Sequence, residues 1–224
     1  MTPSPARPPI RGAAFDLDGL LVNTEQLYQH VGGELLARRG RTFEPDLLDR
    51  MMGRPQRVSL QIMIDWHGLA DTVDGLARET AEIFAGLLDT RLEPMPGAVQ
   101  LVESLVRRGL PRGVATSSGP DFARDVLGRV GLRDRFGFVL TSADVTLGKP
   151  HPEIYERAAA RLGVAPAEML VLEDSENGCR AAVAAGAVVV AVPGGHSLRH
   201  DFTGARLIAD SLADPRITEL LALA

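Results

Sequence analysis

The chain has 224 residues, of which 45% are hydrophobic and 24% are charged, and its formal net charge is -5. This composition is ordinary for a globular protein, and the absence of excess positive charge argues against nucleic acid as a principal partner. A single cysteine, Cys179, excludes an intramolecular disulfide framework and a multi-cysteine zinc site, and it favours a reducing, cytoplasmic setting.

The chain begins with a Pro- and Ser-rich stretch, residues 1–11, which is expected to be a loose leader and has no apolar core of signal-peptide length. Residues 10–17 are mostly small or apolar without alternation, which predicts a parallel strand buried on both faces. Asp16 and Asp18 stand at the end of this strand, directly before Gly19.

Residues 24–92 have helical periodicity and no strong strand pattern. Helices are predicted over residues 25–39, 44–52, 55–67 and 72–89, and the segment Met95-Pro96-Gly97 then interrupts the periodic pattern. The most apolar stretch of the whole chain, residues 181–192, is much shorter than the ~20 residues that span a bilayer, so no membrane association is expected.

From residue 98 onward, predicted helices alternate with predicted strands. The helices are expected at 98–108, 122–130, 152–162 and 176–185 and near the C-terminus, and the strands at 113–116, 137–141, 169–172, 187–192 and 207–209. This alternation predicts an α/β fold, a Rossmann-like parallel sheet with helices on both faces. The sheet core comprises residues 1–21 and 93–224, and residues 22–92 form an all-helical domain inserted after the first strand.

Four polar clusters follow apolar runs at the predicted strand-to-helix transitions. They contain the pair Asp16 and Asp18, the segment Thr116-Ser117-Ser118, the segment Gly148-Lys149-Pro150, and the segment Glu173-Asp174-Ser175. Ligands of open α/β sheets bind outside the carboxyl ends of the strands. We therefore expect the four clusters to meet at one edge of the sheet.

Several carboxylates in one cleft repel one another unless a cation is present. Hard oxygen ligands favour Mg²⁺, which binds through few carboxylates together with a substrate phosphate. Lys149 is the only lysine among 24 basic residues, and a narrow site that holds a carboxylate and a phosphate oxygen suits its compact charge. The clusters together predict a magnesium-dependent site for a phosphorylated substrate.

Each cluster also has an ordinary structural explanation when it is taken alone. Asp-x-Asp before a glycine can form a turn, and the serine, threonine and acidic residues can cap helices. The segment at Lys149 is not a P-loop, because Ala143 and Pro150 occupy positions that require glycine and serine or threonine. The joint occurrence at one sheet edge favours the functional interpretation.

Four segments, which span nearly the whole chain, resemble the haloacid dehalogenase-like hydrolase superfamily and, within it, the β-phosphoglucomutase-like phosphatase branch. They are FDLDGLLVNTE (residues 15–25), ATSS (115–118), GKPHPEIY (148–155) and LEDSENG (172–178). The segments DGLLVNTEQLY, PMPGA and ATSS are most similar to pseudouridine-5′-phosphatase-like members.

The resemblance implies a hydrolase that forms an aspartyl-phosphate on Asp16. Asp18 would be the general acid and base, which protonates the leaving oxygen and then activates water, and its backbone carbonyl would bind Mg²⁺. Lys149 would pair with Asp16 and with the phosphate.

The resemblance also implies how the metal and the phosphate are held. Asp174 would bind the metal, and Glu173 would bind it either directly or through a neighbouring group. Thr116 and the backbone N–H of Ser117 would hold phosphate oxygens.

The helical insertion resembles the cap domain of this branch, which excludes water and selects the substrate. Arg54 and Arg57, close to Gly53, are the cap residues predicted to reach an anionic or polyhydroxylated substrate. Asn23 stands where this branch often has Asp, and Tyr28 stands where the phosphoglucomutases usually have His. The presence of Tyr28 in place of this His favours hydrolysis over mutase chemistry.

The predicted function is hydrolysis of a small phosphomonoester, either a sugar phosphate or a nucleoside-type phosphate, by a monomeric cytoplasmic enzyme. A phosphosugar mutase of the same branch is one alternative. A non-catalytic module that binds a phosphate ligand is another, although the complete carboxylate set argues against it. A signalling receiver domain is disfavoured, because such domains are about half this length and lack a helical insertion.

Overall fold

The computed structural model describes residues 8–51, 54 and 56–222, and the chain divides into two compact units. The core unit consists of Met1–Asn23 and Glu93–Ala224, and the helical unit consists of Thr24–Leu92.

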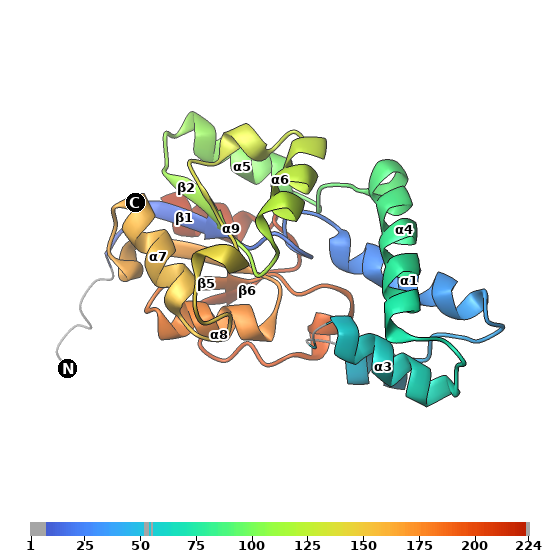
Figure 1. Ribbon diagram of the computed structural model, residues 1–224. Coiled ribbons are helices and arrows are strands. Elements are labelled where there is room, and N and C mark those ends of the chain that lie inside the picture. Colours follow the sequence, from blue (N-terminus) through green and yellow to red (C-terminus); the bar gives the residue numbers. More distant parts are fainter. Residues whose placement is uncertain (1–7, 52–53, 55, 223–224) are drawn as a thin grey trace. The chain divides into compact units, whose positions relative to one another are not determined.

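The core unit is built on a six-stranded sheet in the order β3-β2-β1-β4-β5-β6, in which all paired strands are parallel (Figure 1). The strands are β1 (Gly12–Phe15), β2 (Arg112–Ala115), β3 (Val139–Leu140), β4 (Met169–Glu173), β5 (Val188–Ala191) and β6 (Leu207–Ile208). β1 pairs with β2 and β4, so the first strand of the chain lies near the middle of the sheet.

Helices cover both faces of this sheet, as Figure 1 shows for α5 and α6 on one side and α7 and α8 on the other. The helices are α5 (Ala98–Arg107), α6 (Pro120–Arg129), α7 (Glu153–Leu162), α8 (Glu176–Ala184) and α9 (Pro215–Ala222). Ala14 of β1 belongs to the core with α7 and α8, and the next residue, Phe15, contacts Phe136 edge to face with ring centroids 5.6 Å apart. The predicted α/β fold with helices on both faces is confirmed.

The end of β1 leads into a tight turn. Gly19 has φ of 77°, a left-handed conformation that glycine adopts without steric cost, and its N–H donates to the carbonyl of Val22. Beyond the turn, Asn23 and Glu93 join the two crossings between the units: the N–H of Asn23 donates to the Glu93 carbonyl, and the N–H of Glu93 donates to Asn23 Oδ1. This turn fixes where Asp16 and Asp18 leave the sheet.

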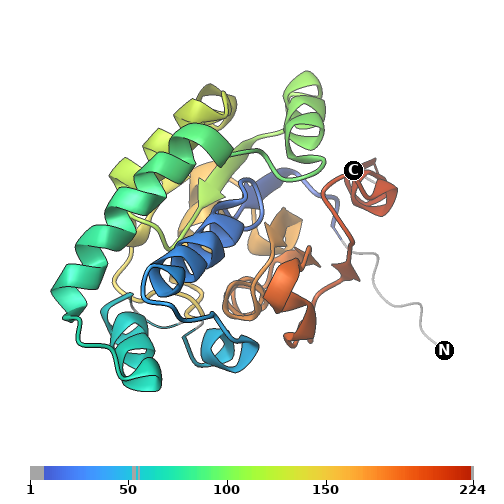
Figure 2. The ribbon, with the colours of Figure 1, turned by 90° about the vertical axis from the view of Figure 1, so that its right-hand side faces the viewer.

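The helical unit contains α1 (Thr24–Ala37), α2 (Pro45–Met51), α3 (Gln56–His67) and α4 (Val73–Arg91). α1 packs against α4, and α3 packs against both α2 and α4; Figure 2 shows α1 and α4 in blue and green. Thr72 caps α4 by accepting a hydrogen bond from the N–H of Gly75, which is why this helix begins where the sequence predicts.

A network of ion pairs joins the end of α1 to α4. Arg39 donates through Nη2 to Asp71 Oδ1 and to Glu79 Oε2, both at 2.7 Å, and Arg38 donates to the other oxygen of Glu79. The side chain of Arg39 is only 18% exposed. Arg38 and Arg39 therefore have a structural role within the helical unit.

The predicted elements differ from the observed ones mainly at their ends. Strand β1 is shorter than the predicted strand at residues 10–17, and the predicted helices over 44–52 and 55–67 end or begin at residues outside the described part of the chain. The expectation of a loose leader through residue 11 is wrong at its end, because Ile10 is buried and the N–H of Arg11 donates to the Glu168 carbonyl. Residues 1–7 of that leader lie outside the described residues.

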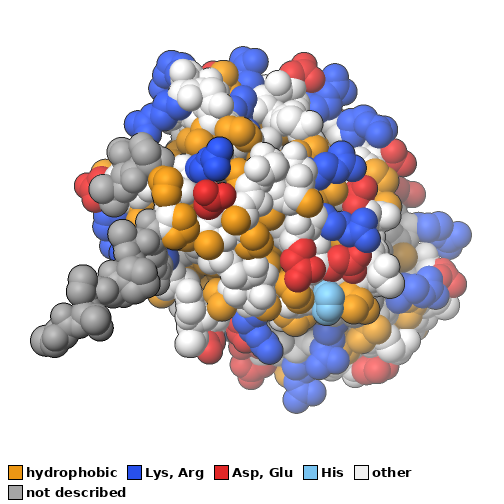
Figure 3. All heavy atoms as spheres, turned by 90° about the vertical axis from the view of Figure 1, so that its left-hand side faces the viewer, with side chains coloured by type: hydrophobic (Ala, Val, Ile, Leu, Met, Phe, Trp, Pro, Cys, Tyr) orange, Lys and Arg blue, Asp and Glu red, His pale blue; other side chains and the backbone are white. Residues whose placement is uncertain are grey.

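The surface carries charges of both signs. On the face in Figure 3, basic and acidic side chains are interspersed, without a broad basic patch. In the described ranges, no helix combines the length and the apolar character that a membrane crossing requires.

Replacing Arg39 by Ala is expected to lower the free energy of unfolding by about 1–2 kcal/mol, because it leaves Asp71 and Glu79 partly buried without this partner. Arg57→Ala is the matched control: Arg57 pairs with Asp74, but both side chains are largely exposed, so the change should stay within about 0.5 kcal/mol. Urea unfolding followed by circular dichroism measures both variants. Equal losses would contradict the structural role of Arg39.

Candidate active site

The carboxyl ends of three neighbouring strands carry the polar residues that the sequence predicts as a site. Asp16 directly follows β1, Thr116 directly follows β2, and Asp174 directly follows β4. Lys149 comes from the segment before α7. All four belong to the core unit and are buried or nearly so.

Lys149 is the centre of this cluster. Its Nζ donates to Asp16 Oδ1 at 2.5 Å, to Glu173 Oε1 at 2.6 Å and to the Ala115 carbonyl at 3.0 Å. An ammonium group has three N–H donors, so each has a partner. The side chain is only 5% exposed, and it links the ends of β1, β2 and β4.

Glu173 is the last residue of β4 and is fully buried. Its Oε1 accepts from Lys149 Nζ and from the Tyr155 hydroxyl at 2.7 Å. Its Oε2 accepts from the N–H of Asp174 and from the N–H and hydroxyl of Ser175, at 3.0–3.2 Å. Both carboxylate oxygens therefore already accept several hydrogen bonds from protein donors, and one of them holds Lys149.

The start of α8 is shaped around the Glu173 carboxylate. Ser175 caps this helix by accepting a hydrogen bond from the Gly178 N–H. A Cβ atom at position 178 would lie 1.7 Å from Glu173 Oε1. Only glycine allows the first turn of α8 to approach the carboxylate this closely.

Asp18 lies at the same edge and is held by hydroxyl groups that follow β2. Ser118 Oγ donates to Asp18 Oδ2 at 2.6 Å, and Thr116 Oγ1 lies 3.3 Å from the same oxygen. Thr116 Oγ1 in turn accepts from the N–H of Ser118. These bonds fix the orientation of the Asp18 carboxylate relative to the segment after β2.

Three carboxyl groups are close enough to share one cation. Asp16, Glu173 and Asp174 each offer an oxygen, and these oxygens all lie within 4.8 Å of one another. A set of hard oxygen ligands of this kind fits Mg²⁺. No described residue hydrogen-bonds Asp16 Oδ2, so this oxygen is available to a metal or a substrate.

Burial changes the protonation of the central pair. Burial raises the pKa of Asp16 to about 8; Lys149 opposes this rise, and the charges of Glu173 and Asp18 add to it. Burial alone would lower the pKa of Lys149, but Asp16 and Glu173 outweigh it and hold that pKa well above its usual range. Lys149 is therefore an ammonium ion, and a second cation bound beside Asp16 would lower the pKa of that carboxyl and favour its ionised form.

The structure brings together six of the predicted site residues, which all lie in the core unit: Asp16, Asp18, Thr116, Lys149, Glu173 and Asp174. Ser117 follows Thr116 and is exposed. The two predicted arginines lie in the helical unit. There Arg54 Nε donates to the Arg50 carbonyl, and Arg57 Nη1 donates to Asp74 Oδ1.

Three residues contribute to this geometry without having been assigned a role from the sequence. Ser118 binds Asp18, Tyr155 binds Glu173 and lies with its ring centroid 5.0 Å from Lys149 Nζ, and Gly178 makes room for Glu173. Each lies within one of the four recognised segments. The partners of Ser118 and Tyr155 are 100 and 18 positions away, so no local pattern indicates their role. Gly178 is close to Glu173 in sequence, but the approach of α8 to that carboxylate is seen only in the structure.

Comparisons with known proteins identify a family model and several proteins to which this chain is similar. A family model described as "haloacid dehalogenase-like hydrolase" matches residues 10–186. The chain is 34% identical over 208 residues to the "probable pseudouridine-5′-phosphatase" of Drosophila melanogaster, covering 89% of each protein. It is 30% identical over 204 residues to the bifunctional riboflavin kinase/FMN phosphatase of Arabidopsis thaliana, covering 91% of this chain but only 54% of that protein.

A solved structure, the "putative beta-phosphoglucomutase" of Thermotoga maritima, superimposes with a TM-score of 0.78 at 28% identity. The match covers 96% of this chain and 98% of that one.

Gly178→Ala is expected to lower the free energy of unfolding by roughly 2–4 kcal/mol, because the new methyl group displaces the Glu173 carboxylate from its donors. Gly128→Ala is the matched control, since Gly128 is also within a helix but a Cβ atom added there would meet no neighbouring atom within 4 Å. That change should be neutral or stabilising by up to about 1 kcal/mol. Urea unfolding of both variants distinguishes the two effects, and similar values for the pair would disprove the packing argument.

The pKa of Asp16 predicts how stability depends on pH in the presence of a chelator. An unfolded aspartate titrates near ~3.9, so between about pH 4 and pH 8 the folded chain holds a proton that the unfolded chain releases. The free energy of unfolding should fall as pH rises through this window, by up to about 1.4 kcal/mol per pH unit. Asp16→Asn should flatten this slope between pH 5 and 8, whereas exposed Asp134→Asn should keep it; parallel curves for all three proteins would contradict the prediction.

Proposed function

Because the chain belongs to the haloacid dehalogenase-like hydrolases, we propose that it is a Mg²⁺-dependent phosphatase that hydrolyses a small phosphomonoester through an aspartyl-phosphate on Asp16. The observation that carries the proposal is the contact of the single lysine with Asp16, next to the carboxylate of Asp174. Residues 93–224 and 1–21 supply the chemistry, and residues 22–92 act as the cap.

Asp16 is proposed as the nucleophile. Lys149 fixes its Oδ1, and within the described residues Oδ2 has no hydrogen-bond donor, so Oδ2 is the atom that attacks phosphorus. The bond from phosphorus to the leaving oxygen breaks as the bond to Oδ2 forms, and water later cleaves the aspartyl-phosphate to release phosphate. A carboxylate nucleophile divides hydrolysis into two easier steps.

Asp18 is proposed as the general acid and base. In the first step it gives a proton to the leaving oxygen, and in the second it takes a proton from the attacking water. The hydroxyls of Ser118 and Thr116 orient its carboxylate. Asp18 is held by side-chain hydroxyls that follow β2, whereas Lys149 binds the carboxylates of Asp16 and Glu173 and the backbone carbonyl of Ala115, so the proton-transfer group and the ammonium have different side-chain partners.

The phosphate and the metal are assigned to groups at the same edge. Mg²⁺, when bound, neutralises developing charge on the phosphate oxygens, and the ligands proposed for it are Asp16, Asp174 and the backbone carbonyl of Asp18. Glu173, whose oxygens accept from protein donors, acts mainly by holding Lys149. Lys149 also pairs with the phosphate, and one of its three present hydrogen bonds is exchanged when the phosphate binds.

Thr116, the N–H of Ser117 and the cap residues Arg54 and Arg57 complete the proposed substrate contacts. Two of the relatives are named as an FMN phosphatase and a probable pseudouridine-5′-phosphatase, which supports a nucleoside-type phosphate as the substrate. Other relatives named as phosphatases of phosphorylated carbohydrates and of fructose 1-phosphate support a sugar phosphate. We further propose that the enzyme acts as a monomer in the cytoplasm. A buried Cys179 and the absence of other cysteines in the sequence are consistent with a reducing compartment.

The proposed function is tested by phosphate release from a panel of sugar, nucleoside and short-chain acid phosphates, with Mg²⁺ and with EDTA. We expect release with Mg²⁺ and none with EDTA. Isomer formation with little phosphate release would indicate a phosphosugar mutase. Binding of a phosphorylated ligand without any release would indicate a non-catalytic module.

Two substitutions should separate the proposed catalytic steps. Asp16→Asn should abolish turnover, because no nucleophile remains, and Asp18→Asn should lower kcat by roughly 10²–10⁴-fold, because proton transfer is lost. Asp125→Asn is a matched control on the exposed surface of α6 and should keep wild-type kcat. Wild-type rates in the Asp16 variant would refute the mechanism.

A further inference from the structure

The core unit contains a pocket of about 340 Å³ at the amino ends of β2 and β3, which is large enough for a small organic molecule. Its lining includes Arg112, the first residue of β2, Gly137 and Phe138, which precede β3, and Leu162, the last residue of α7. Thr116 of the candidate active site follows β2 at the other end of that strand. The pocket therefore lies at the opposite edge of the sheet from the proposed catalytic residues, within the same unit.

The guanidinium of Arg112 has an edge without a hydrogen-bond acceptor. Its Nη1 donates to the Leu110 carbonyl at 2.7 Å, but its Nε is buried and has no hydrogen-bond partner among the described residues, and none of these residues accepts from Nη2. Burial lowers the pKa of Arg112, an effect that Glu103 opposes and Arg135 increases, yet an arginine remains positively charged in a protein. The Nε and Nη2 donors form the fork that pairs with the two oxygens of a carboxylate.

Positive charge exceeds negative charge around this pocket. Arg161, in the last turn of α7, also lines the pocket, and it forms no ion pair or hydrogen bond with a described side chain. The carboxylate that acts on Arg112 is Glu103 of α5, and Arg135 Nε already pairs with it at 2.6 Å. Lining residues also come from the last turns of α5 and α7, whose carbonyl ends each carry only about half a negative charge. The two guanidinium groups in the lining therefore favour an anion.

Apolar side chains form much of the remaining lining, among them Val106, Leu110, Phe138 and Leu162. The ring of Phe138 packs directly over Gly113 of β2, where an added Cβ atom would lie 2.2 Å from the ring. The absence of a side chain at position 113 therefore determines where this ring lies. An apolar group of a ligand gains free energy when it is buried against such a surface, and an aromatic ring can in addition stack on Phe138.

We propose that this pocket binds a small organic carboxylate with an apolar body, such as an aromatic carboxylic acid, and that Arg112 and Arg161 hold its carboxylate. The guanidinium of Arg112 turns toward the cavity on binding, because its Nε is enclosed in the present position. Inorganic phosphate fits less well, since it has no group to bury against Phe138 and loses more hydration. The site is separate from the proposed catalytic residues, so the inference goes beyond the proposed function and does not rest on it.

Titration of the full-length protein with three probes, followed by NMR in metal-free buffer, tests the two parts of the ligand. Benzoate carries a carboxylate and a ring, acetate carries only the carboxylate, and benzyl alcohol carries the ring without the charge. We expect benzoate to bind saturably and roughly tenfold or more tightly than either of the others, because only benzoate satisfies both parts of the lining. Equal affinity for benzoate and benzyl alcohol, or no saturable binding of benzoate, would overturn the proposal.

The same NMR spectra locate the bound probe. Benzoate should shift the backbone N–H signals of Gly109 and Gly137, which belong to the lining. The signals of Ser118 and Gly178, near Asp18 and Glu173 at the opposite edge of the sheet, should not move. Shifts confined to the second pair would show that benzoate binds at the candidate active site and would refute the proposed location.

Substitutions of the two arginines test their separate contributions. Arg161→Gln changes an exposed side chain, so the protein should fold, and the affinity for benzoate should fall about 3–10-fold while that for benzyl alcohol is unchanged. Arg112→Gln should lower the affinity for benzoate by roughly tenfold or more, and Arg112→Lys, which keeps the charge but lacks the fork, should lie between Arg112→Gln and the wild type.

Arg124→Gln is the matched control, because Arg124 is exposed on α6, pairs with Asp121 and is not part of the pocket lining. It should bind benzoate as the wild type does. Urea unfolding of each variant shows whether a loss of affinity reflects a loss of the fold. Wild-type affinity for benzoate in both Arg161→Gln and Arg112→Gln would overturn the assignment of these residues and with it the proposed site.

Discussion

The charge balance around the Lys149 ammonium is the constraint on which the rest of the active-site structure depends. One buried cation lies between the carboxylates of Asp16 and Glu173, and its third donor binds a backbone carbonyl of β2. Losing one partner of a buried ion pair leaves an uncompensated charge, which costs several kcal/mol. The ends of β1, β2 and β4 are therefore held together by the same group that prepares Asp16 for chemistry.

This constraint also accounts for the residues around Glu173. A buried carboxylate requires donors for both oxygens, and they are supplied by Tyr155 on one side and by the first turn of α8 on the other. Gly178 permits that turn to approach. The segment LEDSENG therefore supplies hydrogen-bond donors to the Glu173 carboxylate and also contains the proposed metal ligand Asp174.

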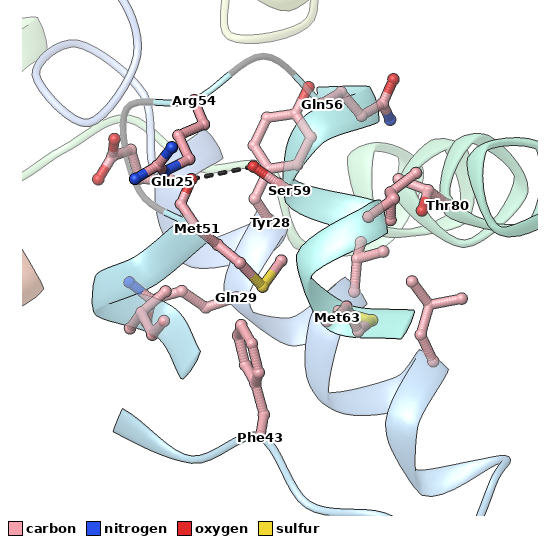
Figure 4. Close-up of a pocket in the computed structure, with 15 residues that line it drawn as sticks. Glu25, Tyr28, Gln29, Phe43, Met51, Arg54, Gln56, Ser59, Met63 and Thr80 are labelled. Carbon is pink, nitrogen blue, oxygen red and sulfur yellow. Dashed lines mark hydrogen bonds between the residues drawn. The ribbon is translucent and has the colours of Figure 1, made fainter. Parts of the chain in front are cut away.

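The fold and the location of the candidate site were accessible from the sequence because polar residues follow continuous apolar runs. Asp16, Thr116 and Asp174 each mark the end of a buried strand, and parallel strands bring such ends to one edge. The partners of Tyr155 and Ser118 were not accessible, because those contacts join residues 18 and 100 positions apart. The pocket of the helical unit, which residues of α1, α2, α3 and α4 line (Figure 4), was also not accessible, since a cavity depends on how helices pack and leaves no periodic pattern in the sequence.

Asn23, in the segment FDLDGLLVNTE, is hydrogen-bonded to Glu93 where the chain passes between the two units. The resemblance to the β-phosphoglucomutase-like branch implies an Asp at the position of Asn23, and the side-chain oxygen of Asn23 accepts from the N–H of Glu93. That hydrogen bond needs only a carbonyl-type acceptor, which an amide and a carboxylate both provide. Asn23 therefore provides the contact that joins the two crossings without carrying a negative charge.

The burial of the single lysine has a consequence for the chemical reactivity of the whole surface. All other basic side chains are arginines or histidines, so the folded protein presents no ε-amine to acylating or crosslinking reagents. Reaction at Lys149 requires its Nζ to leave Asp16, Glu173 and the Ala115 carbonyl first. The rate of lysine acylation would then report on opening of the catalytic edge, with no background from other lysines.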